Sequence, residues 1–293
     1  MDSPLLGARR AAIDDIAAAL KLAEGGIGPG TLVVTAGPGS GKTHTLRHLA
    51  SGLGLATRWS TADELSWRQP YAVAAALLNV AIPDPVPAGF VDDLIEVVVA
   101  MSAREPHLLV VDDAHNADSG SLEFLGRLAS TTVDLPVAVL IARRHLPTRE
   151  LLARLVARPF TREWQLPPMD PADLEVLTRE VVGGWPDDAL SGLVAASGGN
   201  PMHARTLLED LRSRGEVAVV GDRATVPGTV SSIPVTSLQA VIRHQLALLD
   251  DGSRALVCTL AVWGGPATLA DLADLDDVPP SVLVGAAQTA IDA

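Results

Sequence analysis

Residues 36–43 read Ala36-Gly37-Pro38-Gly39-Ser40-Gly41-Lys42-Thr43. The three glycines permit backbone angles that are closed to other residues, so successive N–H groups can point inward at one anion. A run rich in β-branched residues precedes this loop at 31–35, and apolar residues follow it at helical spacing over 43–53. This order of strand, glycine-rich loop and helix is the Walker A pattern, and it predicts a phosphate-binding loop.

The side chains of the loop fit the chemistry of a bound nucleotide. Lys42 is expected to reach the β- and γ-phosphates and to stabilise the reaction, and the Thr43 hydroxyl is expected to bind Mg²⁺. The helix adds the positive end of its dipole to the same anion site, and His44 lies in its first turn. Ala36 replaces the usual first glycine, but its small side chain leaves room. Residues 36–44 are therefore expected to hold ATP or ADP.

A second motif is a pair of acids after an apolar strand. The run Leu108-Leu109-Val110-Val111 ends in Asp112 and Asp113. Such a strand delivers its last carboxylates to the carboxyl edge of a parallel sheet, where ligands of these sheets bind. We expect Asp112 to hold Mg²⁺, mainly through water, and Asp113 to orient or deprotonate the attacking water. The alternative is a solvent-facing acidic turn, which the phosphate loop disfavours.

Strands and helices alternate over the first part of the chain. Further strands are expected at 56–60, 107–111, 136–142 and 163–166, and helices near 11–22, 70–80, 88–103, 119–130 and 149–157. This alternation predicts a parallel sheet covered by helices on both faces. After it, we expect helices at 171–182, 186–196 and 202–213 and a small hairpin at 217–226. The predicted domains are an α/β nucleotide-binding domain at 1–168, a helical lid at 169–228 and a small helical domain at 229–293.

Composition excludes several classes of protein. The chain has 293 residues, of which 48% are hydrophobic, so it can bury a core of about two domains. A formal net charge of −13 argues against a generally basic surface for nucleic acid. The longest apolar runs are far shorter than the ~20 residues of a membrane span, and no signal peptide is recognisable, so a cytoplasmic protein is expected. The single cysteine, Cys258, lies in an apolar run and is expected to be buried.

Four segments in a specific order resemble one family, over about residues 4–290. The run Asp112-Asp113-Ala114-His115-Asn116-Ala117-Asp118 is similar to the Walker B region of STAND-type ATPases in large LuxR-type bacterial regulators. Residues 139–144 are similar to the sensor strand of that family, which ends in arginine. Leu6-Gly7-Ala8-Arg9 stands where the family has a Gly-Arg pair, and Gly198-Gly199-Asn200-Pro201 matches its Gly-Gly-Asn-Pro motif.

The resemblance assigns arginines to the site. Ala8 interrupts the Gly-Arg pair, so either Arg9 or Arg10 is expected near the nucleotide. Either Arg143 or Arg144 would sense the γ-phosphate, and a surface arginine at a strand end is the alternative for both.

It also assigns roles to His115 and to the junction at 198–201. His115 would relay the state of the γ-phosphate, or it is a structural histidine with its hydrogen bonds satisfied. The junction, including Pro201, would lie against the nucleotide and carry its state into the lid. Local chemistry explains the same residues, because a glycine ends one helix, Asn200 caps the next and Pro201 fits its first turn.

The fold and function implied by the resemblance are those of a switch. An extra strand would lie between the Walker A and Walker B strands, and a helical lid and a winged-helix-like domain would follow. The module would be closed with ADP, open and self-associating with ATP, and slow to hydrolyse ATP. In the resembling regulators a C-terminal helix-turn-helix binds DNA. This chain ends at Ala293, before such a domain, so we expect a fragment or truncated homologue of a transcriptional regulator.

The alternative is a P-loop enzyme with steady turnover, either a motor-type ATPase or a small-molecule kinase. A kinase would show an arginine-rich lid over the phosphates, and the region 145–165 offers only scattered arginines at 149, 154, 158 and 162. A GTPase is disfavoured, because no Asn-Lys-x-Asp motif for reading guanine occurs in the sequence.

Overall fold

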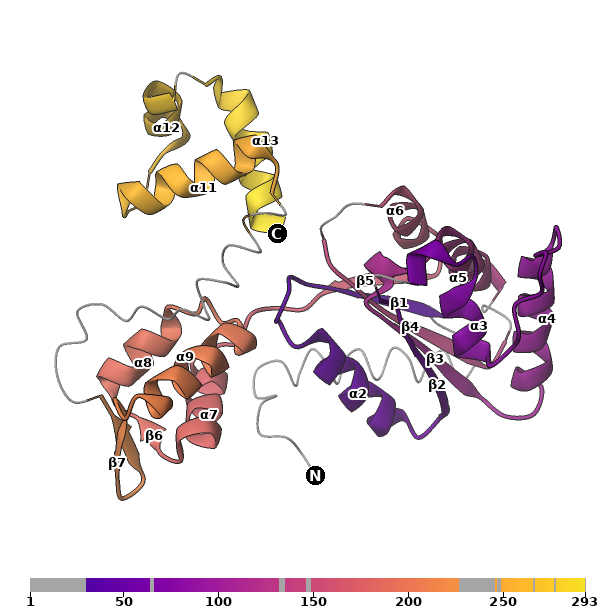
Figure 1. Ribbon diagram of the computed structural model, residues 1–293, viewed down its shortest axis with the longest axis horizontal. Coiled ribbons are helices and arrows are strands. Elements are labelled where there is room, and N and C mark those ends of the chain that lie inside the picture. The colour runs from indigo at the N-terminus through magenta and orange to yellow at the C-terminus, as the bar shows by residue number, and fades with distance from the viewer. Residues whose placement is uncertain are drawn as a thin grey trace.

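A computed structural model shows three successive groups of elements along the chain (Figure 1). It describes residues 30–63, 66–131, 135–145, 149–226, 246, 249–265, 267–276 and 278–292. The predicted helix near 11–22 lies outside the described residues, as do Arg9 and Arg10. The predicted domain boundaries at 168 and 228 stay predictions.

The first group is built on a five-stranded parallel sheet. The order across the sheet is β2-β3-β4-β1-β5, so β4 lies between the strands that precede the two phosphate motifs, and the extra strand implied by the resemblance is present. Strands β1 and β3 are buried along their whole length, as expected of central strands covered on both faces. The strand bounds are β1 (Thr31–Thr35), β2 (Ala56–Thr61), β3 (His107–Asp112), β4 (Val137–Arg143) and β5 (Thr161–Gln165).

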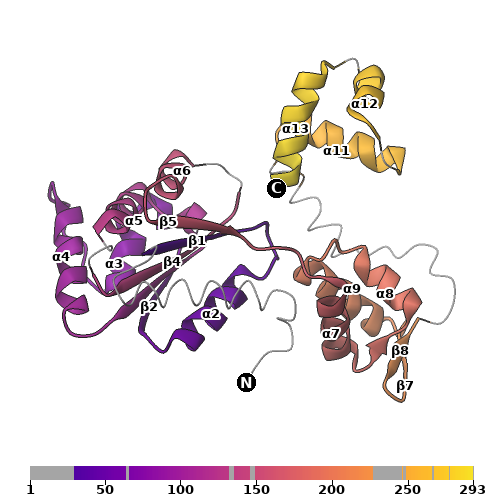
Figure 2. The same cartoon turned by 180° about the vertical axis from the view of Figure 1, so that it is seen from behind.

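Helices cover both faces of this sheet (Figures 1 and 2). Helix α2 (Lys42–Leu53) buries Leu46 and Leu49 against one face. The other face packs on four helices, α3 (Ala72–Leu78), α4 (Phe90–Ser102), α5 (Ser119–Thr131) and α6 (Glu150–Val156). Successive strand residues point to opposite faces of the sheet. Val33 therefore packs on the face covered by α3 to α6, and Val34 packs on the face covered by α2. Short 3₁₀ helices follow β2 and β3, namely η2 (Ser66–Arg68) and η3 (Ala114–Asn116).

The second group, called the lid here after the prediction for residues 169–228, is a bundle of three helices with a small sheet. The helices are α7 (Pro171–Val182), α8 (Asp188–Ala195) and α9 (Pro201–Ser213), close to the predicted bounds. Each begins at a residue whose side chain accepts hydrogen bonds from the first turn, namely Asp170, Asp187 and Asn200. The predicted hairpin is formed by β7 (Ala218–Val220) and β8 (Arg223–Thr225), and the unpredicted two-residue strand β6 (Trp185–Pro186) pairs with β8.

Among the described residues from 251 onward, the third group has three helices with a small shared core. They are α11 (Asp251–Trp263), α12 (Leu269–Asp276) and α13 (Pro280–Asp292). The core contains Leu256, Leu272 and Leu283. The prediction for Cys258 is wrong, because this side chain is exposed. Helix α11 is apolar around most of its circumference, and Leu256 faces the core while Cys258, two positions on, faces away from it.

Within the described residues, no helix combines the length and apolar character that crossing a bilayer requires.

Candidate nucleotide-binding site

Two of the three glycines in the loop after β1 use the conformational freedom that the sequence analysis expected of all three. Gly39 and Gly41 adopt left-handed angles, with φ of 71° and 90°, whereas Gly37 is not among the residues with positive φ. Ser40 donates from Oγ to the carbonyl oxygen of Gly37 at 2.8 Å and closes the turn. Helix α2 starts at Lys42, so the free N–H groups of its first turn belong to the phosphate loop.

Lys42 is buried at the centre of the loop, with 7% of its surface exposed. Its Nζ donates to the carbonyl oxygens of Ala36 at 3.1 Å and Gly37 at 2.8 Å. Burial, followed by the nearby charge of Arg144, lowers the pKa of Lys42 to about 8, although Asp113 and Asp112 act in the opposite direction. A buried ammonium group in this position is suited to an anionic ligand, because an anion would offset the cost of its desolvation.

The structure brings Thr43 and Asp112 together from two sequence motifs that are 69 positions apart. The Thr43 hydroxyl donates to Asp112 Oδ2 at 2.7 Å, and Asp112 Oδ1 accepts from the backbone N–H of Asp113 at 2.9 Å. Asp112 is 2% exposed, and burial is the main cause that raises the pKa of its carboxyl group.

This oxygen pair fits Mg²⁺. Mg²⁺ keeps several waters and takes one or two protein oxygens together with phosphate oxygens, so a hydroxyl beside a single buried carboxylate is the expected donor set. Among the described residues no group of three or more His, Cys, Asp or Glu is placed to hold a metal.

Asp113 is held in a left-handed conformation, with φ of 51°. Its side chain is 32% exposed, and its Oδ1 lies 3.9 Å from Nδ1 of His115. This backbone region is unfavourable for residues other than glycine, and the exceptions cluster at functional sites. Asp113 is therefore the more accessible of the two acids, as its expected role toward water requires.

His115 is buried beside the phosphate loop, with 5% exposure. Within the described part of the chain its Nδ1 has no hydrogen-bond partner, so the interpretation as a satisfied structural histidine does not hold for this atom. Burial, then the charges of Arg144, Lys42 and Arg149, lower the pKa of His115 to about 4. The ring is thus neutral at physiological pH, and its Nδ1 can donate or accept a hydrogen bond, depending on the tautomer.

The two candidate sensor arginines have different surroundings. Arg143 donates from Nη2 to Glu163 at 2.7 Å and from Nε to the Thr35 hydroxyl at 3.1 Å. The charge of Arg144 instead helps to lower the pKa of Lys42 and that of His115. Among the described residues the buried Nε of Arg144 has no hydrogen-bond partner. Arg143 is thus engaged within the sheet, whereas Arg144 is the arginine whose charge reaches Lys42.

Two residues near the site were not assigned a role from the sequence. Arg149 donates from Nη1 to the carbonyl oxygens of His115 and Ala117, so it holds the turn η3 from outside. Asp118 accepts from the backbone N–H groups of Tyr71 at 2.6 Å and Ser121 at 2.8 Å, which ties the same turn to helices α3 and α5. The contacts of Arg149 and the contact of Asp118 with Tyr71 join residues far apart in the sequence, whereas the contact of Asp118 with Ser121 spans three positions and is a local capping pattern at the start of α5.

The junction between α8 and α9 touches the phosphate loop. Asn200 donates from Nδ2 to the carbonyl oxygen of Pro38 at 2.9 Å, and the N–H of Met202 donates to the carbonyl oxygen of Gly39 at 3.2 Å. Asn200 also accepts from the first turn of α9 through Oδ1, so it acts as a helix cap and as a contact to the loop at once. Pro201 is the first residue of that helix, as expected.

The backbone at this junction approaches its neighbours closely. A Cβ placed on Gly39 would lie 2.6 Å from Cε of Met202, and one on Gly199 would lie 2.5 Å from the carbonyl oxygen of Met169. Both glycines therefore have a packing reason as well as a conformational one. His44, the third residue of α2, has an exposed side chain.

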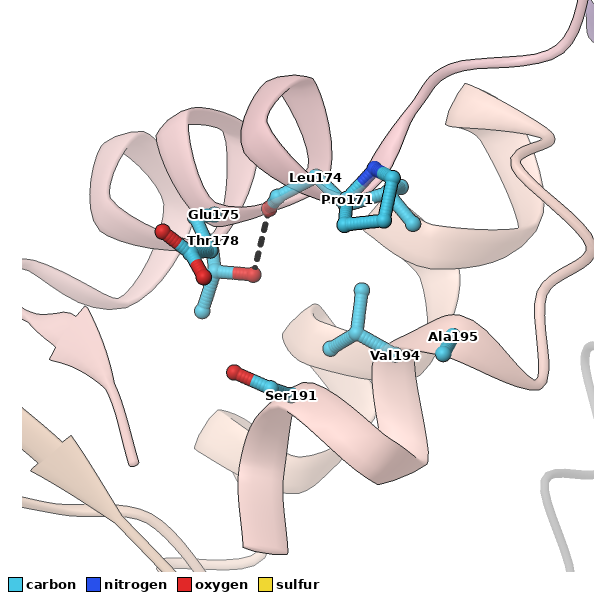
Figure 3. A pocket seen from close by; sticks show the side chains of 7 residues that line it. All are labelled: Pro171, Leu174, Glu175, Thr178, Ser191, Val194 and Ala195. Atoms are coloured by element: carbon cyan, nitrogen blue, oxygen red, sulfur yellow. Dashed lines mark hydrogen bonds between the residues drawn. The ribbon is translucent and has the colours of Figure 1, made fainter. Parts of the chain in front are cut away.

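A separate apolar pocket lies within the lid, between α7 and α8 (Figure 3). The Thr178 hydroxyl there donates to the carbonyl oxygen of Leu174 at 2.7 Å and is not free for a ligand. None of its lining residues comes from the phosphate loop or from β3, so this pocket is distinct from the nucleotide site. The lining residues are Pro171, Leu174, Glu175, Thr178, Ser191, Val194 and Ala195.

Comparison with known proteins agrees with this geometry. Residues 27–149 match the sequence profile of a family described as AAA domain. No curated protein sequence matches the chain. The chain is similar to the solved structure of the Aeropyrum pernix Orc1 protein in complex with DNA, with 20% identity and a TM-score of 0.51 over 95% of this chain and 81% of that one.

Two further solved structures are more distant in shape. Cdc6p from Pyrobaculum aerophilum has 17% identity and a TM-score of 0.49, over 71% of this chain and 62% of that one. The Thermotoga maritima RuvB Holliday junction branch migration motor has 18% identity and a TM-score of 0.45, over 94% of this chain and 84% of that one.

The matched residues 27–149 contain both phosphate motifs, from the glycine-rich loop to Asp112 and Asp113. The likeness to Orc1 bears on the fold, and it confirms the predicted parallel sheet with flanking helices and a helical C-terminal region. The chain therefore carries a nucleotide-binding P-loop ATPase domain of the AAA type.

Proposed function

We propose that this chain is a nucleotide-dependent switch whose lid reads the state of the phosphate loop. The observation that carries the proposal is the pair of hydrogen bonds from Asn200 and Met202 to the backbone of Pro38 and Gly39. A change in the loop on binding or losing a γ-phosphate would act directly on the first turn of α9. Because α9 packs against α7 in the lid core, a movement of its first turn would be passed to the whole lid.

In this proposal each residue of the site has one task. The N–H groups of the loop and Lys42 bind the phosphates, and Thr43 and Asp112 hold Mg²⁺, which neutralises phosphate charge when bound. Asp113 orients the attacking water and accepts its proton. Arg144 faces the γ-phosphate and reports its presence.

The turn that carries Asp113 is fixed by its own contacts. Arg149 and Asp118 hold it from two sides, through the carbonyl oxygens of His115 and Ala117 and through the N–H of Ser121. A carboxylate on a rigid turn loses little freedom when it meets water, which favours catalysis once the γ-phosphate is in place.

We further propose that the switch belongs to a transcriptional regulator of the LuxR type, cytoplasmic, with ATP favouring self-association. The support is the set of family motifs, of which the Walker B region and the Gly-Gly-Asn-Pro junction lie around one site. Arg9 or Arg10 would complete the nucleotide contacts. Hydrolysis would be slow, so that the ATP-bound state lasts long enough to signal.

A kinase is disfavoured by the contacts of the arginines that would form its lid. Arg149 holds the turn η3, Arg154 pairs with Glu150, and Arg158 donates to Ser130. Arg149 is thus engaged by the turn η3, Arg154 by its own helix α6, and Arg158 by helix α5. A motor-type ATPase remains the alternative, and the rate of turnover separates it from a switch.

The coupling can be tested with Asn200→Ala. This change removes the contact to Pro38 and a helix cap, so we expect a loss of stability of about 1 kcal/mol, and the protection of α9 from hydrogen exchange should no longer differ between ATP and ADP. Asp187→Ala is the matched control, since Asp187 caps the neighbouring helix α8 by accepting from the N–H of Leu190. Equal nucleotide dependence in wild type and Asn200→Ala would contradict the proposed route.

DNA binding gives a further test, because the Orc1 structure contains DNA. The last unit of this chain carries seven Asp and one Arg from residue 250 onward, and these acids would repel phosphates. We expect no sequence-selective binding by this chain at near-physiological salt, with or without ATP. The measurement is fluorescence anisotropy with random genomic fragments and the promoters of neighbouring genes. Tight and selective binding would show that a local basic surface outweighs the net charge of −13.

A further inference from the structure

Three polar side chains form a closed cluster at the carboxyl edge of the sheet. Thr35 donates from Oγ1 to Glu163 Oε1 at 2.5 Å, and Arg143 donates from Nη2 to the same oxygen at 2.7 Å. Arg143 Nε also donates to the Thr35 hydroxyl at 3.1 Å. Each member therefore contacts the other two.

The cluster links three neighbouring strands, two of which lead directly into the phosphate loop and to Arg144. Thr35, Arg143 and Glu163 lie in β1, β4 and β5, which are neighbours in the sheet. The next residue after Thr35 opens the phosphate loop, and the next residue after Arg143 is Arg144. The N–H of Ala36 also donates to the carbonyl oxygen of Arg143 at 3.3 Å. The first residue of the phosphate loop is therefore hydrogen-bonded to the residue that precedes Arg144.

The charged pair in the cluster is mostly shielded from water. The side chain of Arg143 is 12% exposed and that of Glu163 is 27% exposed. Burial alone would raise the pKa of Glu163, but the hydrogen bonds from Thr35 and Arg143 outweigh it and the pKa is lowered. Glu163 is therefore ionised at neutral pH, and a hydrogen-bonded pair of this kind holds its members in one arrangement.

Arg144 has no such support of its own. Among the described residues its buried Nε lacks a hydrogen-bond partner, while its charge acts on Lys42 and His115. The backbone sets the direction in which the Cα–Cβ bond of Arg144 leaves the end of β4. The neighbouring cluster holds that backbone through Arg143, the residue before Arg144.

We propose that Glu163 is a positioning residue for Arg144: it anchors Arg143 and Thr35 so that the following Arg144 is aimed at the γ-phosphate. This inference rests on the proposed function, in which Arg144 senses that phosphate. Glu163 itself does not touch nucleotide in this scheme.

The test compares affinities for ADP and for an ATP analogue with a non-hydrolysable β–γ bridge, measured by titration calorimetry on the whole chain. Arg144→Ala is expected to weaken the ATP analogue about tenfold or more and to leave ADP nearly unchanged, because a charged hydrogen bond to the γ-phosphate is lost. Glu163→Gln and Glu163→Ala should weaken the analogue selectively in the same sense. The control is Glu150→Gln, which breaks the exposed pair with Arg154 and should change neither affinity.

A double variant separates positioning from plain stabilisation. If Glu163 acts through Arg144, Glu163→Gln should have no further effect on the analogue in an Arg144→Ala background. The isosteric Gln variant guards against loss of folding in the Ala variant, and urea unfolding shows how far each is destabilised.

The possible results are distinct. Additive effects in the double variant, or a Glu163→Gln protein with wild-type affinities, would overturn the positioning role. A wild-type chain that binds neither nucleotide would overturn the proposed function itself.

Discussion

Replacing Lys42 by alanine is expected to lower the affinity for ATP by about ten- to hundredfold. The ammonium group lies buried in the phosphate loop, and a charged hydrogen bond to phosphate contributes about 1.5–3 kcal/mol. The alanine chain should still fold, because the substitution removes a buried charge whose hydrogen bonds to two backbone carbonyl oxygens are modest in net effect. Titration calorimetry with Mg-ATP measures the effect.

Arg47→Ala provides a control for this experiment. Arg47 lies on the same helix with an exposed side chain, so its loss changes the net charge equally without touching the loop. An unchanged affinity in Lys42→Ala, or an equal loss in both variants, would mean that the phosphates bind elsewhere.

Asp113→Asn is expected to retain Mg-ATP binding and to slow hydrolysis by about 10²- to 10⁴-fold, the usual contribution of a general base. Asparagine tolerates the left-handed conformation of this position, so the turn should keep its shape. Asp112, which contacts Thr43, remains as the metal partner. Single-turnover hydrolysis and calorimetry on the same protein separate the two effects.

The companion variant Asp112→Asn should behave differently. It removes the carboxylate that would hold Mg²⁺, so the advantage that Mg²⁺ gives to ATP binding should disappear. If Asp113→Asn abolished binding while Asp112→Asn slowed turnover alone, the roles of the two acids would be exchanged.

The sequence was sufficient for the features that are written locally. Glycine spacing, the apolar run before Asp112 and the capping residue Asn200 each belong to one short stretch. The structure places the predicted elements between residues 31 and 226 within about two residues of expectation. Short-range conformational preferences and helix or strand periodicity decide these features.

Features that depend on distant partners could not be read in this way. The hydrogen bond of Arg143 involves Glu163, which lies on another strand, and the contact of Asn200 with Pro38 spans 162 positions. The strand β6 has two residues and exists through its pairing with β8. Cys258 was misplaced because α11 is apolar on most sides, so periodicity did not show which face is buried.

The time course of phosphate release at saturating Mg-ATP tests most directly whether the chain is a switch. A switch holds its nucleotide, so the account predicts about one phosphate released per chain, followed by a steady rate far below about 1 s⁻¹, the lower end of ordinary enzymes. Continuous release at or above that rate would contradict the account and would show that the chain is a cycling ATPase.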